Sequence, residues 1–424
     1  MIAEKSNTAQ FIIERIAASA GKVGHLSDTL LSQAMLQLES KGFPTNKTED
    51  YKYCNLDAIL KKEFKNPEQQ FSEAPDIKPY LLADTVTLVV LNGRYSPELS
   101  DKVVLKGLSI TGFDQLKGSE AAQVGSLAEV TSDAFIALNT AFCSGGFKLE
   151  IAPNEELQIP LHILYVTTSE SEAIVNGRNL IVMGENSSAS IIEHYVLAGK
   201  GKTFSNYVSE KLLLKNARLN CSTIQEEGVR GYTVNANQVQ LENDAHYDNT
   251  TITLSGALVR NNHNVVLNGT HCQANLNGLF TSANTQLVDN HTLMDHRMPH
   301  CESNEIYKGI ISDKSTGVFN GKIFVRRDAQ KTNAYQSSKN ILLSDDATIN
   351  TKPQLEIYAD DVKCSHGTST GRIDQEALFY LKARGIGDDS ARKLLLASFA
   401  QEIINRIEVE SLKEKVMLAL GQDL

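Results

Sequence analysis

The sequence contains no tryptophan, only 6 cysteines and 9 prolines in 424 residues, and no excess of basic charge. Without tryptophan, a function based on stacking sugars or single-stranded nucleic acid is disfavoured. The net charge of −10 argues against nonspecific binding to nucleic acid and against docking on anionic membranes. The cysteines are scattered from Cys54 to Cys364, which is not the pattern of a disulfide framework and indicates a reducing compartment.

Long apolar runs are also missing. No stretch approaches the ~20 residues of a membrane-spanning helix, and Met1–Asn7 lacks the basic start and apolar core of a signal peptide. We therefore expect a cytoplasmic protein with no membrane partner. Its length and its 41% of hydrophobic residues suffice for a large core and for two or three domains.

The first ~65 residues have the apolar periodicity of helices. A first helix is predicted from Phe11, Ile12, Ile16 and Ala20. A second has Leu26, Leu30, Ala34 and Leu38 on one face and is ended by Gly42 and Pro44. Residues 66–79 carry three prolines among charged residues, which is typical of a linker.

Strand character begins at residues 85–91 and is followed by a turn at Asn92–Gly93. A helix is expected near residues 133–142, and residues 147–360 read as short β-rich runs broken by polar turns. Fourteen asparagines fall within residues 216–290, and asparagine tolerates the left-handed conformation of tight corners. Asn-Gly pairs at Asn176, Asn268, Asn277 and Asn320 favour antiparallel hairpins, whereas closely spaced Asn-rich corners also suit a β-helix. Periodicity alone leaves both open.

The last ~55 residues return to helical patterns. Asp374 is a suitable N-cap for one helix, and Gly385 lies just past its end. A second helix starts near Asp388 with an apolar stripe of Leu395, Phe399, Ile403 and Ile407, and a third has Leu412, Val416 and Leu420. We expect these stripes to dock on the end of the β region or on a partner.

One motif brings together two metal-ligand side chains. Cys364 and His366 are two residues apart at the end of a strand-like segment, so both would point to the same face. Zinc, iron and iron–sulfur clusters favour thiolate and imidazole ligands. Two ligands do not complete a tetrahedral site, so the others would come from elsewhere in the chain or from another subunit.

A second cluster contains His291, His296, His300 and Cys301. Its spacings match no known zinc module, and its members would span more than one corner of a β-helix. It nevertheless keeps open the alternative of an independent metal-binding protein.

The Cys364–His366 motif continues into Gly371–Asp374, Glu376–Leu381 and Arg384–Ile386. This segment resembles the C-terminal signature of the SufB/SufD family of iron–sulfur cluster assembly scaffolds, in its SufD version. Further segments resemble the family's N-terminal, early-strand and core elements: Glu49–Tyr53, Asn92–Ser100, Tyr307–Ile310, Gly317–Lys322 and Ala329–Thr332. The similarity extends from about residue 45 to the C-terminus.

The resemblance implies a mainly β protein with a right-handed parallel β-helix between two helical domains. The expected bounds are 1–80 for the N-terminal helical domain and linker, 81–365 for the core with a leading β/α segment at 81–146, and 366–424 for the C-terminal helices. The family's subunit of this kind is a noncatalytic scaffold that pairs with a SufB-type sister and holds a SufC-type ABC ATPase. Pairing of the isolated chain with a second copy is left open.

The resemblance also suggests site residues. His366, and less strongly Cys364, would face the sister subunit and handle iron or a nascent cluster. Arg384, Gly385, Ile386, Asp388, Leu395 and Phe399 are candidates for contact with the ATPase. No tightly bound cofactor is expected in the chain itself; iron or a cluster would be transient, and a reduced flavin is suggested only for the full complex.

Two departures argue against a SufB identity. Gly367 stands where the sister family has Glu after its His, and Ser338–Asn340 replaces a segment that carries a Cys. The chain has no complete P-loop, so we expect a partner to supply ATP hydrolysis. A β-helix carbohydrate-active enzyme is a weaker alternative, because Asp360 and Asp361 are adjacent and would point to opposite faces.

Overall fold

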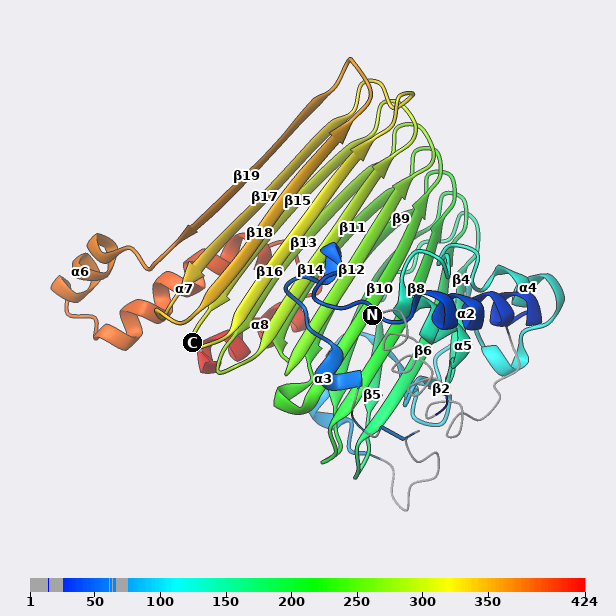
Figure 1. The fold of residues 1–424 in the computed structure, drawn as a ribbon, viewed down its shortest axis with the longest axis horizontal. Coiled ribbons are helices and arrows are strands. Elements are labelled where there is room, and N and C mark those ends of the chain that lie inside the picture. The colour runs from blue at the N-terminus through cyan, green and yellow to red at the C-terminus, as the bar shows by residue number, and fades with distance from the viewer. Residues whose placement is uncertain (1–13, 15–25, 61, 63, 66–74, 424) are drawn as a thin grey trace.

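The computed structural model describes residues 14, 26–60, 62, 64–65 and 75–423 (Figure 1). The first expected helix, with Phe11, Ile12, Ile16 and Ala20, and most of the expected linker lie outside these residues. The described part is a parallel β-solenoid of about eight turns with helices at both chain ends, which confirms the predicted β-helix. The antiparallel sandwich or barrel is therefore wrong.

Successive strands of the solenoid alternate between two sheets. Sheet 1 contains β1 (Val86–Leu91), β2 (Arg94–Ser96), β5 (Leu161–Thr167), β7 (Ser188–Leu197), β9 (Arg218–Glu226), β11 (His246–Ser255), β13 (Gln273–Ser282), β15 (Glu302–Ile311), β17 (Asn333–Leu342) and β19 (Lys363–Gly371). Sheet 2 contains β3 (Leu108–Gly112), β4 (Gly145–Ile151), β6 (Ala173–Met183), β8 (Thr203–Leu213), β10 (Gly231–Leu241), β12 (Leu258–Leu267), β14 (Leu287–His296), β16 (Thr316–Val325) and β18 (Thr348–Ile357).

The core lies between the two sheets. Each strand sends alternate residues inward, and the parallel pairing places equivalent residues of neighbouring turns side by side. Tyr165 of β5 pairs with Tyr195 of β7, for example, and their rings stack with centroids 4.5 Å apart. One continuous apolar cluster consequently runs along the solenoid from Val86 to Ala359.

The Asn-Gly pairs do not form hairpins, so that interpretation is wrong. Asn176, Asn277 and Asn320 lie inside β6, β13 and β16, and Asn268 directly follows β12. The glycines are needed for space: a Cβ at Gly278 would lie 2.2 Å from the ring of Tyr307, its partner on β15. In contrast, Asn92–Gly93 does form the expected turn between β1 and β2, with both residues at positive φ.

One corner of the solenoid repeats the left-handed backbone conformation from turn to turn. The residues with positive φ at this corner are Asn154, Asn186, Asn216, Asp244, His271, His300 and Lys331. Several donate their backbone N–H to the next turn, as Asn186 does to the carbonyl of Lys215. Asparagine favours this conformation, but two of these positions are histidines. The density of asparagines in the sequence therefore predicted only some of the corners.

Most of the N-terminal segment covers the outer face of sheet 2, whereas residues 77–80 pack against sheet 1. It contains the helices α2 (Asp28–Lys41), α3 (Asp57–Leu60), α4 (Gly118–Gln123) and α5 (Ala134–Ala141) and the 3-10 turns η1 (Glu49–Tyr51), η2 (Lys78–Tyr80) and η3 (Phe113–Gln115). Leu38 of α2 and Phe135 and Leu138 of α5 pack in one apolar cluster with residues of sheet 2. A further short turn, η4 (Gly228–Arg230), precedes β10.

Three helices complete the chain: α6 (Gln375–Ala383), α7 (Asp388–Ile404) and α8 (Glu410–Asp423). The apolar faces of α7 and α8, including Ile403 and Leu412, pack on the outer face of sheet 1 against residues such as Ile224. The helices therefore dock on the side of the solenoid and leave its last turn uncovered (Figure 1). None of the described helices is long and apolar enough to cross a membrane.

Candidate functional site

The C-terminal end of the solenoid is an open edge in both sheets. β19 is the last strand of sheet 1 and β18 the last strand of sheet 2. Side chains of both strands are mostly half-buried or exposed, unlike those of the earlier turns. An edge strand presents unpaired backbone N–H and C=O groups that another chain can pair with. The open edge is therefore suited to strand addition by a partner.

Cys364 and His366 lie on this last turn. β19 continues to Gly371, so the two residues are near the start of the strand and not at its end, and the strand passes residue 365, the expected end of the core. Cys364 pairs with Ala334 and His366 with Gln336, both of which face the interior. The prediction that both side chains share one face is confirmed, and this face is the interior of the solenoid at its open end.

The two side chains differ in exposure. His366 is exposed, and within the described residues no hydrogen bond or ion pair engages it. Cys364 is half-buried against the core, and this burial raises the pKa of its thiol. Near neutral pH the imidazole is thus the more accessible ligand, because thiols bind metals as thiolates.

The candidate residues for contact with the ATPase lie on the C-terminal helices and in the turn between α6 and α7. Asp374 caps α6 through its side chain, which accepts the N–H groups of Glu376 and Ala377, and Gly385 has a φ of 87° just past the helix. Arg384 donates to the hydroxyl of Tyr380 at 2.8 Å. Asp388 accepts from Lys382 and Arg392, which holds the pKa of its carboxyl below the usual range.

The apolar candidates on α7 and in the turn before it face the protein more than the solvent. Leu395, Phe399 and Ile386 are half-buried in a cluster around Ile310 and Leu378. Lys308 lies 4.8 Å from the centroid of the Phe399 ring and donates to its carbonyl. Their predicted contact with an ATPase remains a prediction, and it would be made only through part of each side chain.

The helices expose other large apolar side chains that sequence periodicity did not single out. Phe379 is 73% exposed, Tyr380 57% and Leu394 52%. Large exposed apolar groups on neighbouring helices are typical of a protein–protein contact. The available signal was helix geometry: Phe379 lies about 100° and Tyr380 about 200° around the helix from the buried Leu378, so neither shares its buried side.

The second cluster of candidate ligands is dispersed by the fold. His291 lies on the outer face of sheet 2, His296 is buried inside with its Nε2 2.9 Å from the Oγ of Ser303, and His300 stacks on His271 at a corner. Cys301 is buried beside Cys272, and both thiols contact the carbonyl of Gly269. Among the described residues, no group of three or more His, Cys, Asp or Glu side chains is placed to hold a metal ion.

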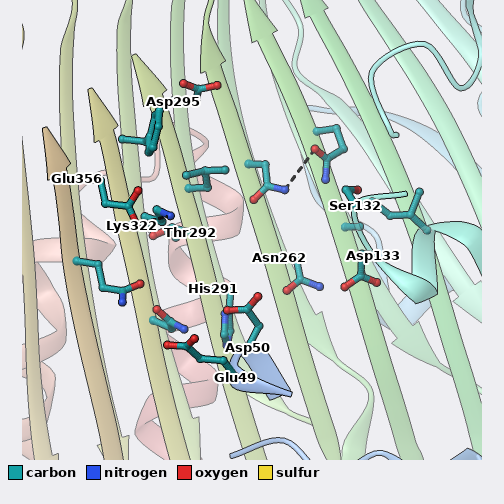
Figure 2. Close-up of a pocket in the computed structure, with 18 of the residues that line it drawn as sticks. Glu49, Asp50, Ser132, Asp133, Asn262, His291, Thr292, Asp295, Lys322 and Glu356 are labelled. Atoms are coloured by element: carbon teal, nitrogen blue, oxygen red, sulfur yellow. Dashed lines mark hydrogen bonds and ion pairs between the residues drawn. The ribbon is translucent and has the colours of Figure 1, made fainter. Parts of the chain in front are cut away.

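His291 instead belongs to a groove of about 610 Å³ between sheet 2 and the N-terminal segment (Figure 2). Its Nε2 lies 3.0 Å from Oδ1 of Asp289, whose other oxygen pairs with the buried Arg260. Burial by itself would raise the pKa of Asp289, but His291 and Arg260 hold it at about 2. Arg260 also covers the ring of Tyr51 and donates to the carbonyl of Asp50. The cluster thus ties the N-terminal segment to the solenoid.

Two family models match this chain. A family model described as SUF system FeS cluster assembly, SufBD core domain, matches residues 165–399, and one for the SufBD protein N-terminal region matches residues 23–163.

Three relatives illustrate the similarity. The iron–sulfur cluster assembly protein SufD of Escherichia coli is 31% identical over 92% of each chain. A SufBD family protein of Synechocystis is 29% identical over 89% of this chain and 87% of its own. SufD of Bacillus subtilis is 28% identical over 66% of this chain and 64% of its own. The chain therefore belongs to the SufBD family of the SUF iron–sulfur cluster assembly system.

Proposed function

We propose that this protein is a noncatalytic, SufD-type scaffold subunit that pairs with a SufB-type sister through the open end of its solenoid. Its role in iron–sulfur cluster assembly is supported by both family models and by its relatives. The observation that carries the pairing is the uncovered last turn, where β18 and β19 leave both sheet edges free. Strand addition there would extend both sheets into the partner.

His366 would then lie inside the junction of the two subunits. It is the exposed imidazole on the interior face of β19, so a partner that covers the last turn would enclose it. Imidazole and thiolate are suitable ligands for iron and iron–sulfur clusters. In this proposal, iron or a nascent cluster is the cargo, His366 contributes one ligand, and Cys364 is a weaker second candidate.

A SufC-type ATPase would bind the C-terminal helices. Phe379, Tyr380 and Leu394 provide an exposed apolar surface beside Arg384 and Asp388. Removing all residues after Gly371 would be a poor test of this contact, because α7 and α8 cover apolar residues of sheet 1. Point substitutions of the exposed side chains leave that packing intact.

The experiment is affinity purification of the tagged full chain, co-expressed with a SufB-type and a SufC-type protein, followed by intact-mass and iron analysis. We expect all three proteins to elute together. His366→Ala should lower the iron content at least several-fold without dissolving the complex, and Phe379→Ser should release the ATPase only. Recovery of the chain alone, or unchanged iron with His366→Ala, would contradict the proposal.

A further inference from the structure

Two cysteines lie side by side on neighbouring turns of the solenoid. Cys272 directly precedes β13, and Cys301 directly precedes β15. The first residues of these strands, Gln273 and Glu302, pair in parallel register, and the N–H of Glu302 donates to the carbonyl of Cys272 at 2.9 Å. The two cysteines are therefore direct neighbours across the sheet. Neighbouring strands are about 4.8 Å apart, which lies within the roughly 4.4–6.8 Å that separate the Cα atoms of a disulfide.

The side chains of the two cysteines also meet. Each sulfur lies 3.2 Å from the carbonyl oxygen of Gly269, so the sulfur atoms cannot be farther apart than twice that distance. A hydrogen bond between the thiols lowers the pKa of Cys301 and, together with burial, raises that of Cys272. The preceding imidazoles, His271 and His300, stack with their ring centroids 5.1 Å apart. The two corners thus touch through both pairs of side chains, and Cys301 is the thiol that ionises more easily.

The same position on other turns holds small residues without a thiol. Ala217 precedes β9, Ala245 precedes β11 and Thr332 precedes β17, and all three are fully buried, as the two cysteines are. In-register pairing of the following strands places these residues in one column with the cysteines. An alanine or a threonine therefore satisfies the packing at this corner. Two adjacent thiols exceed that requirement, and alanine is a substitution that the fold already uses here.

We propose that Cys272 and Cys301 form a two-thiol redox site, which hydrogen peroxide converts into a disulfide between neighbouring turns of the solenoid. The Cys301 thiolate attacks the peroxide: a sulfur–oxygen bond forms, the O–O bond breaks, and the leaving hydroxide takes up the proton that Cys301 released. The sulfur of Cys272 then attacks the sulfenic sulfur of Cys301. Its hydroxyl group leaves as water with the proton of the Cys272 thiol. Two thiols thus lose two electrons, and one peroxide becomes two molecules of water.

The site is close to solvent, although both thiols are buried. The residues that flank each cysteine in the sequence are exposed on both sides. A small oxidant therefore needs only a local opening of this corner to reach the sulfur atoms. In the reducing compartment that the cysteine pattern indicates, the thiols stay reduced until peroxide rises, so the bridge is transient. This inference goes beyond the proposed function and does not depend on it.

The test is a titration of the purified, folded full chain with hydrogen peroxide. Catalase stops the reaction, free thiols are alkylated in denaturant, and the digested chain is analysed by mass spectrometry. We expect a linked peptide that joins Cys272 to Cys301 and that dithiothreitol separates. Cys272→Ala should leave Cys301 as a sulfenic acid, which dimedone labels. Cys301→Ala should slow the oxidation of Cys272 roughly tenfold or more, because burial keeps the remaining thiol protonated.

Cys143→Ala is the matched control. Cys143 is also buried, and its sulfur also lies 3.2 Å from a backbone carbonyl, that of Gly145, but it lies between α5 and β4, outside this corner. The control should form the bridge between Cys272 and Cys301 as the unmodified chain does. Oxidation of Cys364 without the linked peptide, or a linked peptide only after unfolding in urea, would overturn the proposal. The co-purification test of the open end uses none of these variants, so each proposal can fail alone.

Discussion

The pH dependence of stability offers a direct check on the environment of Glu305, a buried carboxylate on β15. The ordinary pKa of such a carboxyl is 4.5, and burial raises that of Glu305 to about 7 in the folded protein. A raised folded-state pKa means that the folded protein binds the proton more tightly than the unfolded chain. The stability associated with this group is therefore present below pH 4.5 and is lost as the pH rises through 7.

The magnitude follows from the shift of about 2.5 pKa units, which corresponds to about 3 kcal/mol. Glu305→Gln keeps an acceptor oxygen for Thr292 and Gln336, whose side chains donate to Glu305, but cannot ionise. The difference in the free energy of unfolding between the variant and the unmodified protein should therefore shift by about 3 kcal/mol in favour of the variant as the pH rises from 4.5 to 8. All other titrating groups are shared, so they cancel in the difference.

The assay is urea unfolding of both proteins at several pH values with EDTA present, so that cations do not contribute. Glu227→Gln should show the same trend, because burial raises the pKa of Glu227 to about 7 as well. A difference between Glu305→Gln and the unmodified protein that stays constant across this range would refute the environment described for Glu305.

Two further predictions concern the interior. Gly278→Ala should lower the free energy of unfolding by about 1–3 kcal/mol, because its Cβ would lie 2.2 Å from the Tyr307 ring. Gly367→Ala is the control, since there is open space around that residue. Equal urea midpoints for Gly278→Ala and the unmodified protein would contradict the prediction. Burial lowers the pKa of His296 from 6.5 to about 4, so stability is lost as the pH falls from 6.5 towards 4, by about 3 kcal/mol. His296→Gln should remove this loss of stability in the same unfolding assay. If the variant lost as much stability as the unmodified protein between pH 6.5 and 4, the prediction would be contradicted.

Features that depend on neighbours in the sequence were predictable. The helix at Ala134–Ala141 lies where its periodicity placed it and is capped by Asp133, and Gly42 ends the preceding helix α2 as expected, with Ser27 as its N-cap. The turn at Asn92–Gly93 follows from the ability of both residues to adopt positive φ. These signals act over a few residues, so no knowledge of the rest of the chain is required.

Features that depend on the next turn of the solenoid were not predictable in this way. Whether Asn277–Gly278 is a hairpin or a strand interior is decided by Tyr307, which lies on the next turn of the solenoid. Glu305 gave no signal either, because a charged residue is usually expected on a surface. Its position becomes informative only when the register places it behind Gln336 and His366.

The two ends of the solenoid are finished differently, and this difference supports the proposed interface. At the N-terminal end, the edge strands are short: β2 has 3 residues and β3 has 5, and they pair antiparallel with β1 and β4. Very short edge strands are one way in which proteins blunt an exposed sheet edge. At the C-terminal end of the described chain, α7 and α8 pack against the side of sheet 1 while β18 and β19 stay uncovered. Short edge strands at one end and full-length edge strands at the other, with His366 facing the second, therefore support the proposed pairing with a second solenoid at the C-terminal end.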